Sequence, residues 1–170
     1  MANVTGRTAE KVSNQMTAIW NNFDNGSKSL EYYADVITAL GAATASSSDE
    51  IATGLSKFAA VADTVGLSYE NATAAMATIT ATTRQSADSV GNGLKTLFSR
   101  LQSLSLGKTL EDGVNLTKYT KALNTVGVSA LDAAGNLRSM DSILADLGER
   151  WDTLSTAQQN ALAQTVGGVR

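Results

Sequence analysis

The clearest pattern along the chain is an apolar stripe between residues 86 and 106. Its large aliphatic residues recur in alternating steps of four and three, and an aromatic residue widens the stripe. This spacing predicts an α-helix that packs against other helices along one face. The candidate residues for helix packing or subunit contact are Val90, Leu94, Leu97, Phe98, Leu101 and Leu104. Ser86 is expected to cap the helix and Gly107 to end it.

Weaker patterns with the same period predict further helices on both sides of the stripe. Their expected starts lie near Val12, Leu30, Ser47, Ser68, Leu116, Ser139 and Ser155. Glycine is expected to end three of them, at Gly41, Gly66 and Gly127. The chain has no proline, so no position lacks the backbone N–H that a helix uses. We therefore expect a mainly α fold, a multi-helix bundle of seven to eight helices, with the 86–106 helix at its centre.

A different pattern lies near residues 128–138. Two short arms with apolar residues flank the sequence Asp132-Ala133-Ala134-Gly135. Aspartate at the start of a turn and glycine at the left-handed position are typical of a tight turn between strands. The sequence therefore predicts one small β-hairpin here. Because an isolated hairpin is only marginally stable in water, it would have to pack against the helices.

Composition excludes several classes of function. The net charge is −3, and the 13 basic residues are mixed with 16 acidic ones rather than clustered. Nucleic-acid binding is not expected, because it relies on clustered Lys and Arg. The chain has no cysteine and no histidine, so it lacks a disulfide framework and the usual transition-metal ligands. We expect no cofactor, and no apolar run reaches the length of a membrane span.

Candidate catalytic groups are also weak. Glu149 and Asp152 flank Trp151, but carboxylates at this spacing are common on amphipathic helices. A nucleophilic serine needs a base to accept its proton, and the chain has no histidine. We therefore expect no enzymatic activity. Trp151 is either a core residue beside Leu147 and Leu154 or an anchor for a neighbouring subunit, since interfaces favour tryptophan.

Several separate segments between residue 30 and the end follow one another in a distinctive order. They are a helix ending at Val65-Gly66-Leu67-Ser68, an Ala/Thr-rich helix, and the segments Gly93–Phe98, Gly135–Arg138, Leu147–Trp151 and Val166–Arg170. In this order they resemble the core region of phage tail tape measure proteins. The resemblance covers residues 30–170, whereas residues 1–29 form an N-terminal helix and lead-in.

The resemblance implies a structural component of a long phage or prophage tail. Such a protein sets tail length during assembly in the host bacterial cytoplasm and occupies the tail lumen of the virion. Its implied partners are the tail tube protein, tail assembly chaperones and other copies of the same chain. The resemblance implies no catalytic residues in this region, and it implies that residues 30–170 are a fragment of a much longer chain.

Two alternative functions remain open at this point. The first is a membrane-active amphipathic segment that assists genome delivery, with transient membrane contact at infection. It is motivated by the apolar stripe and by the low charge of residues 39–83. The second is a generic helical interaction module with no link to phages.

Overall fold

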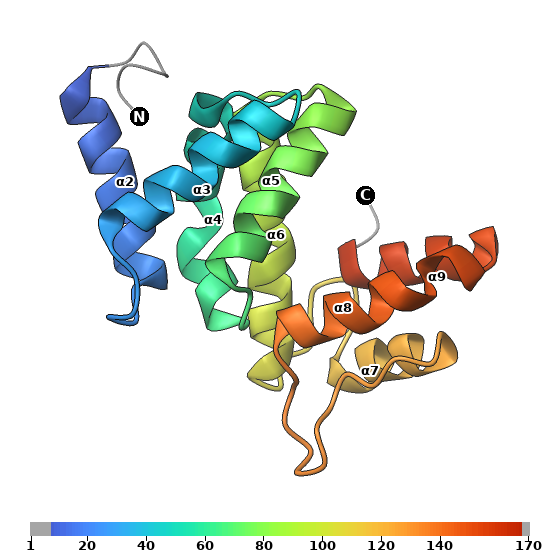
Figure 1. The fold of residues 1–170 in the computed structure, drawn as a ribbon. Coiled ribbons are helices and arrows are strands. Elements are labelled where there is room, and N and C mark those ends of the chain that lie inside the picture. Colours follow the sequence, from blue (N-terminus) through green and yellow to red (C-terminus); the bar gives the residue numbers. More distant parts are fainter. Residues whose placement is uncertain (1–7, 168–170) are drawn as a thin grey trace. The chain divides into compact units, whose positions relative to one another are not determined.

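The computed structural model describes residues 8–167, which form eight α-helices and one short 3₁₀ helix (Figure 1). The prediction of a mainly helical fold with seven to eight helices is confirmed for these residues. The lead-in expected before residue 8 and the last three residues of the chain lie outside them. The helices are α2 (Ala9–Phe23), α3 (Leu30–Ala43), α4 (Ser48–Thr64), α5 (Tyr69–Thr83), α6 (Ala87–Ser105), α7 (Leu116–Thr125), α8 (Met140–Arg150), the 3₁₀ helix η1 (Trp151–Thr153) and α9 (Thr156–Gly167).

The chain divides into two compact units, residues 1–96 and residues 97–170. Helix α6 contributes its first ten residues, 87–96, to the first unit and residues 97–105 to the second. The expected division of the chain after residue 29 stays a prediction.

Helix α4 is the central element of the first unit, where it packs against α2, α3 and α5 (Figure 1). Its start is a capping box. The Ser47 N–H donates to the Glu50 carboxylate at 2.7 Å, and the Glu50 N–H donates to the Ser47 hydroxyl at 3.2 Å. The bond from the Ser47 N–H also lowers the pKa of Glu50. The buried residues of α4 are Ser48, Ile51, Ala52, Gly54, Leu55, Phe58, Ala59 and Ala62.

The predicted end of α4 at Gly66 is confirmed. Gly66 has a φ of +70°, which glycine adopts without a Cβ clash. The Leu67 N–H then donates to the Ala62 carbonyl at 3.0 Å, and the buried Leu67 side chain folds back on the helix. The Ser68 hydroxyl accepts the Asn71 N–H and caps α5 directly afterwards. The predicted cap at Ser86 and stop at Gly107 are confirmed in the same way for α6.

Helices α4 and α6 approach one another closely at two glycines. A Cβ atom added at Gly91 would lie 2.6 Å from the Gly54 carbonyl oxygen, closer than real Cβ atoms come. A Cβ added at Gly54 would lie 3.1 Å from the Ala87 carbonyl oxygen of α6, and 2.0 Å from the methyl carbon of Met76 on α5. The backbones therefore touch where a side chain would separate them. An exposed ion pair between Lys57 and Asp88, at 2.9 Å, bridges the same two helices and contributes little stability.

The second unit is held by an apolar core and by an arginine on α6. Helix α7 packs against α9, and Tyr119, Leu123, Ile143 and Leu162 are buried. Arg100 donates to the Asp112 carboxylate at 2.7 Å and to the Val166 carbonyl at 3.3 Å. It thereby ties α6 to the 106–115 loop and to the end of α9. The Arg100 guanidinium also holds the pKa of Asp112 below its usual value.

The predicted β-hairpin is wrong. Within the described residues, segment 128–138 contains one isolated antiparallel bridge, between Leu131 and Leu137, and no strand. The Asp132 carboxylate accepts the N–H groups of Ala134 and Asn136, both at 2.9 Å, and together with the backbone bond from the Asp132 N–H to the Asn136 carbonyl it closes a tight loop. The bond from the Asn136 N–H lowers the pKa of Asp132. Ser139 caps α8 immediately afterwards, which leaves no residues to extend a second strand.

The expected helix end at Gly41 is also wrong, because α3 continues to Ala43. Gly41 lies inside the helix, where a Cβ atom would come within 2.4 Å of the Ser48 hydroxyl. Its missing side chain allows the start of α4 to pack against α3. Glycine at this position serves close packing rather than chain reversal.

The close approach of α4 and α6 predicts opposite effects for two glycines of the same helix. Gly91→Ala should lower the free energy of unfolding by about 2 kcal/mol, because the added methyl group overpacks the contact. Gly93→Ala is the matched control, since a Cβ there meets nothing within 4 Å. It should raise the free energy of unfolding by about 1 kcal/mol through helix propensity. Urea denaturation followed by circular dichroism measures both, and a stabilising Gly91→Ala would contradict the packing.

Candidate functional site

The apolar stripe predicted from the sequence lies on α6, and five of its six residues are buried. Val90 and Leu94 are 6% and 7% exposed within the first unit, and Phe98, Leu101 and Leu104 are 1–3% exposed within the second. Leu97 is half-buried. The five buried side chains lie in the interior of the two units. Their role in contacts between copies of the chain stays a prediction.

Trp151 lies apart from the stripe, at the start of η1. Its side chain is 41% exposed, and its carbonyl accepts the Gln159 side-chain N–H at 3.0 Å. The neighbouring Leu147 and Leu154 are half-buried, and Leu144 is 43% exposed. The backbone of Trp151 therefore serves the turn between α8 and α9, while a large part of its indole ring faces solvent. Its role as a subunit anchor stays a prediction.

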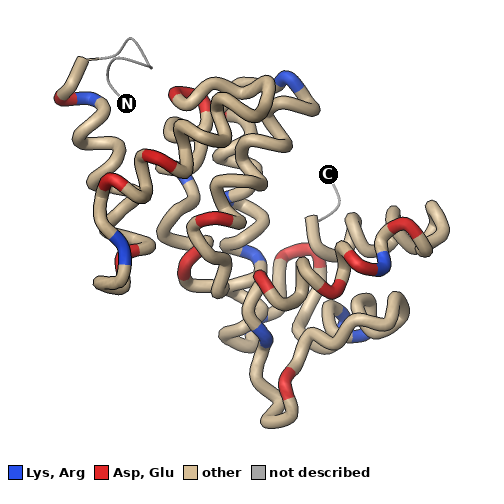
Figure 2. The backbone as a smooth tube through the Cα atoms, in the orientation of Figure 1, with Lys and Arg blue, Asp and Glu red and all other residues tan. Residues whose placement is uncertain are grey.

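Charged groups do not assemble into a chemical site in the described part of the chain. Figure 2 shows basic and acidic residues dispersed along the backbone of residues 8–167. No group of three or more His, Cys, Asp or Glu residues there could hold a metal ion. Glu149 and Asp152 are both exposed, and Glu50 and Asp132 are occupied by the local hydrogen bonds described above. None of the helices in residues 8–167 is long and apolar enough to cross a membrane.

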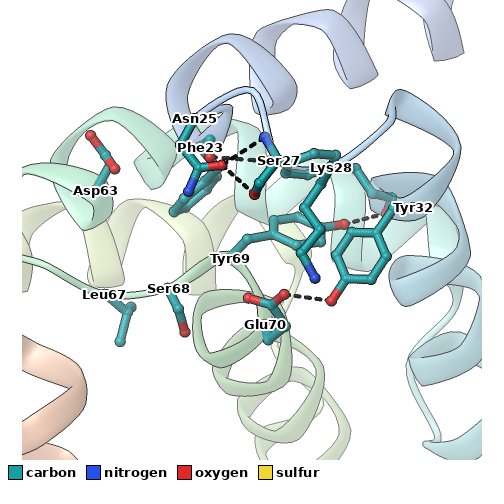
Figure 3. Close-up of a pocket in the computed structure, with 11 residues that line it drawn as sticks. Phe23, Asn25, Ser27, Lys28, Tyr32, Asp63, Leu67, Ser68, Tyr69 and Glu70 are labelled. Carbon is teal, nitrogen blue, oxygen red and sulfur yellow. Dashed lines mark hydrogen bonds between the residues drawn. The ribbon is translucent and has the colours of Figure 1, made fainter.

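The structure does form a pocket in the first unit that the sequence reasoning missed (Figure 3). It has a volume of about 200 Å³ and lies where the end of α2, the loop before α3 and the start of α5 meet. Three of the chain's four tyrosines line it. We call it the aromatic pocket, and its lining residues are Phe23, Asn25, Ser27, Lys28, Tyr32, Tyr33, Asp63, Leu67, Ser68, Tyr69 and Glu70.

Packed rings form the inner part of the aromatic pocket. The Tyr33 and Tyr69 centroids are 4.5 Å apart, and the Phe23 ring meets the Tyr69 ring edge to face at 5.6 Å. The Tyr69 hydroxyl donates to the Tyr33 carbonyl, and the Tyr33 hydroxyl donates to the Phe23 carbonyl at 3.0 Å. Burial raises the pKa of Tyr69 above its usual value. The hydrogen bonds lock both rings in place.

The outer edge of the pocket carries charges. The Tyr32 hydroxyl donates to the Glu70 carboxylate at 2.5 Å, and this bond raises the pKa of Tyr32. The Lys28 ammonium lies 4.1 Å from the centroid of the Tyr32 ring. The adjacent Tyr32-Tyr33 pair was visible in the sequence, but nothing there indicated that Tyr69 would pack against it. The contact joins residues 36 positions apart.

The sequence of the chain is similar to that of known proteins. A family model described as "Phage-related minor tail protein" matches residues 1–168 of the chain. The "Probable tape measure protein" of Escherichia phage P2 is 28% identical over 170 residues, which cover 99% of this chain and 19% of that protein. The chain therefore spans about a fifth of the length of this curated relative. No solved structure matches the chain.

The burial of the stripe predicts how strongly two of its leucines stabilise the second unit. Leu101→Ala should lower the free energy of unfolding by about 3 kcal/mol, because this fully buried side chain would leave a cavity. Leu97→Ala is the matched control on the same helix and should cost about 1 kcal/mol, because Leu97 is only half-buried. Urea denaturation compares the two variants. Equal losses would contradict the difference in burial.

Proposed function

This chain belongs to the phage-related minor tail protein family, and on that basis we propose that it is the core region of a tape measure protein. Membership in the family gives the chain a structural role in the phage tail. The finer proposal is that the parent protein sets tail length during assembly and occupies the tail lumen. The observation that carries it is the similarity to the probable tape measure protein of phage P2 along nearly the whole chain.

The folding of the chain into two units of short helices suggests which part of that task this segment performs. A continuous helix of 170 residues would span roughly 250 Å, since an α-helix rises 1.5 Å per residue. The longest helix of the described residues has 19 residues and spans roughly 28 Å. In this folded form the segment contributes little length to a ruler. We therefore assign the length-setting role to other parts of the parent protein and an assembly role to this segment.

The proposed partners follow from this role. A tape measure protein in the lumen contacts the tail tube protein, and before assembly in the host bacterial cytoplasm it contacts tail assembly chaperones and other copies of itself. The exposed Trp151 of the second unit is a candidate contact residue, because interfaces are enriched in tryptophan, and the exposed Leu144 adds apolar surface in the same unit. Membership in the phage tail family supports a structural role without catalysis.

The proposal predicts different outcomes for deletions inside and outside this segment. In-frame deletions elsewhere in the parent gene should shorten the tails by roughly 1.5 Å per deleted residue, because the ruler is helical. Deletions within residues 30–170 should abolish tails, because they remove buried helices of the assembly element. Electron microscopy of phage particles measures tail length directly.

As a matched control, two deletions of equal length are compared, one inside residues 30–170 and one just outside them. Tails of unchanged length after both kinds of deletion would overturn the tape measure proposal. Tails that shorten equally after both would keep the ruler but remove the separate assembly role of residues 30–170.

The membrane-active alternative needs an apolar face that lipid can reach. In the described residues the stripe on α6 is mostly interior, because five of its six residues are buried. We therefore predict that the folded chain does not float with phosphatidylglycerol–phosphatidylethanolamine vesicles in a density gradient at neutral pH. A basic amphipathic peptide serves as the positive control. Co-flotation of the chain with an unchanged circular dichroism spectrum would favour the membrane function instead.

A further inference from the structure

The aromatic pocket already holds one positively charged group. The Lys28 ammonium lies 4.1 Å from the centroid of the Tyr32 ring, within the range of a cation–π interaction (Figure 3). The Tyr32 hydroxyl donates to Glu70, which fixes the ring and brings a carboxylate to the same edge of the pocket. Lys28 itself is exposed and belongs to the loop before α3. The pocket therefore already accommodates an ammonium group beside an aromatic ring and a carboxylate.

The charges around the pocket also favour a cation. Its lining includes two exposed carboxylates, Asp63 and Glu70, against one ammonium, that of Lys28. Asp24 and Glu70 both act electrostatically on the Tyr33 hydroxyl and help to raise its pKa, although burial is the larger cause. The lining therefore carries one more carboxylate than ammonium groups, and Glu70 is the carboxylate next to the Tyr32 ring. An anionic ligand would meet these carboxylates, whereas a cation would meet carboxylates and ring faces.

The size of the pocket limits the ligand. Its volume of about 200 Å³ lies below the roughly 300 Å³ at which sites for small organic ligands usually begin. The nearly inaccessible Tyr33 and Tyr69 close its inner end, and the half-buried Phe23 and Tyr32 form its sides. This volume, with ring faces beside a carboxylate, suits one side chain with an apolar stem and a charged end. Lysine has this form, because its four-carbon stem packs on apolar surface while the ammonium reaches polar groups.

We propose that the aromatic pocket binds a lysine side chain of a partner protein, which displaces Lys28 from the Tyr32 ring. The incoming ammonium takes the position over the ring and beside the Glu70 carboxylate, and its stem packs against the sides of the pocket. Lys28 then turns outward into solvent. This binding site goes beyond the tail function and does not depend on it, because it concerns the contact chemistry of the first unit alone.

The test uses the whole chain and a short peptide as the probe. The peptide acetyl-Ala-Lys-Ala-amide is titrated into protein labelled on its tyrosine rings, and NMR records the ring signals. The signals of Tyr32 should shift and saturate, whereas those of Tyr119, which is buried in the second unit, should stay unchanged. The same peptide with an acetylated lysine is the neutral control and should produce no saturable shift.

Substitutions in the chain test whether the aromatic pocket binds an external lysine or only packs against its own Lys28. Lys28→Met removes the competing ammonium but keeps an apolar stem, and it should tighten peptide binding about threefold. Lys95→Met, at an exposed position of α6, changes the net charge equally and should leave the affinity unchanged. Glu70→Gln should weaken binding several-fold, and Tyr32→Leu should abolish it. Circular dichroism confirms that each variant is folded.

Two results would overturn the proposal. One is a Tyr32 shift of equal size with the acetylated peptide, which would show that the charge is not recognised. The other is the absence of saturable shifts in both the original chain and Lys28→Met, which would show that Lys28 is only an internal packing group.

Discussion

The backbone contact between α4 and α6 at Gly54 and Gly91 is the constraint on which the first unit depends. Half of the buried residues of α4 are alanine or glycine: beside Ile51, Leu55 and Phe58 its buried face includes Ala52, Gly54, Ala59 and Ala62. Small side chains bury useful apolar area only when the helices approach closely, because any gap forfeits dispersion contacts. The two glycines permit that approach. Only 5% of the residues of the chain are aromatic, and the two glycines allow a core with few large rings to be closely packed.

Features set by local chemistry could be predicted from the sequence, and features set by distant contacts could not. The caps at Ser47 and Ser68 and the stop at Gly66 follow from hydrogen bonds within a few residues, and they are confirmed. Gly41 looked like another stop, but its role depends on Ser48 of the next helix. The central position of α4 was also missed. Large apolar residues mark the buried face of α6 clearly in the sequence, whereas the small alanine and glycine residues of α4 mark its buried face only weakly.

The candidate sites show the same distinction. The stripe of α6 is periodic within one helix, so its residues could be found in the sequence, and five of them prove to be buried. Phe23, Tyr33 and Tyr69 of the aromatic pocket come from three different helices, so no periodic sequence pattern connects them. To predict the pocket, one would have to know that Tyr69 contacts the Tyr32-Tyr33 segment. The sequence near these residues does not indicate such a distant contact.

The burial of the stripe changes where contacts with other tail proteins are to be sought. A side chain that fills the interior of a unit stabilises the fold but cannot also anchor a partner without unfolding that unit. The exposed apolar side chains Leu144 and Trp151 in the second unit, and the aromatic pocket in the first, are free of this conflict. The two surfaces also differ in chemistry, since one is apolar and the other combines ring faces with carboxylates. The two units therefore offer two candidate contact surfaces of unlike chemistry, and neither requires its core to open.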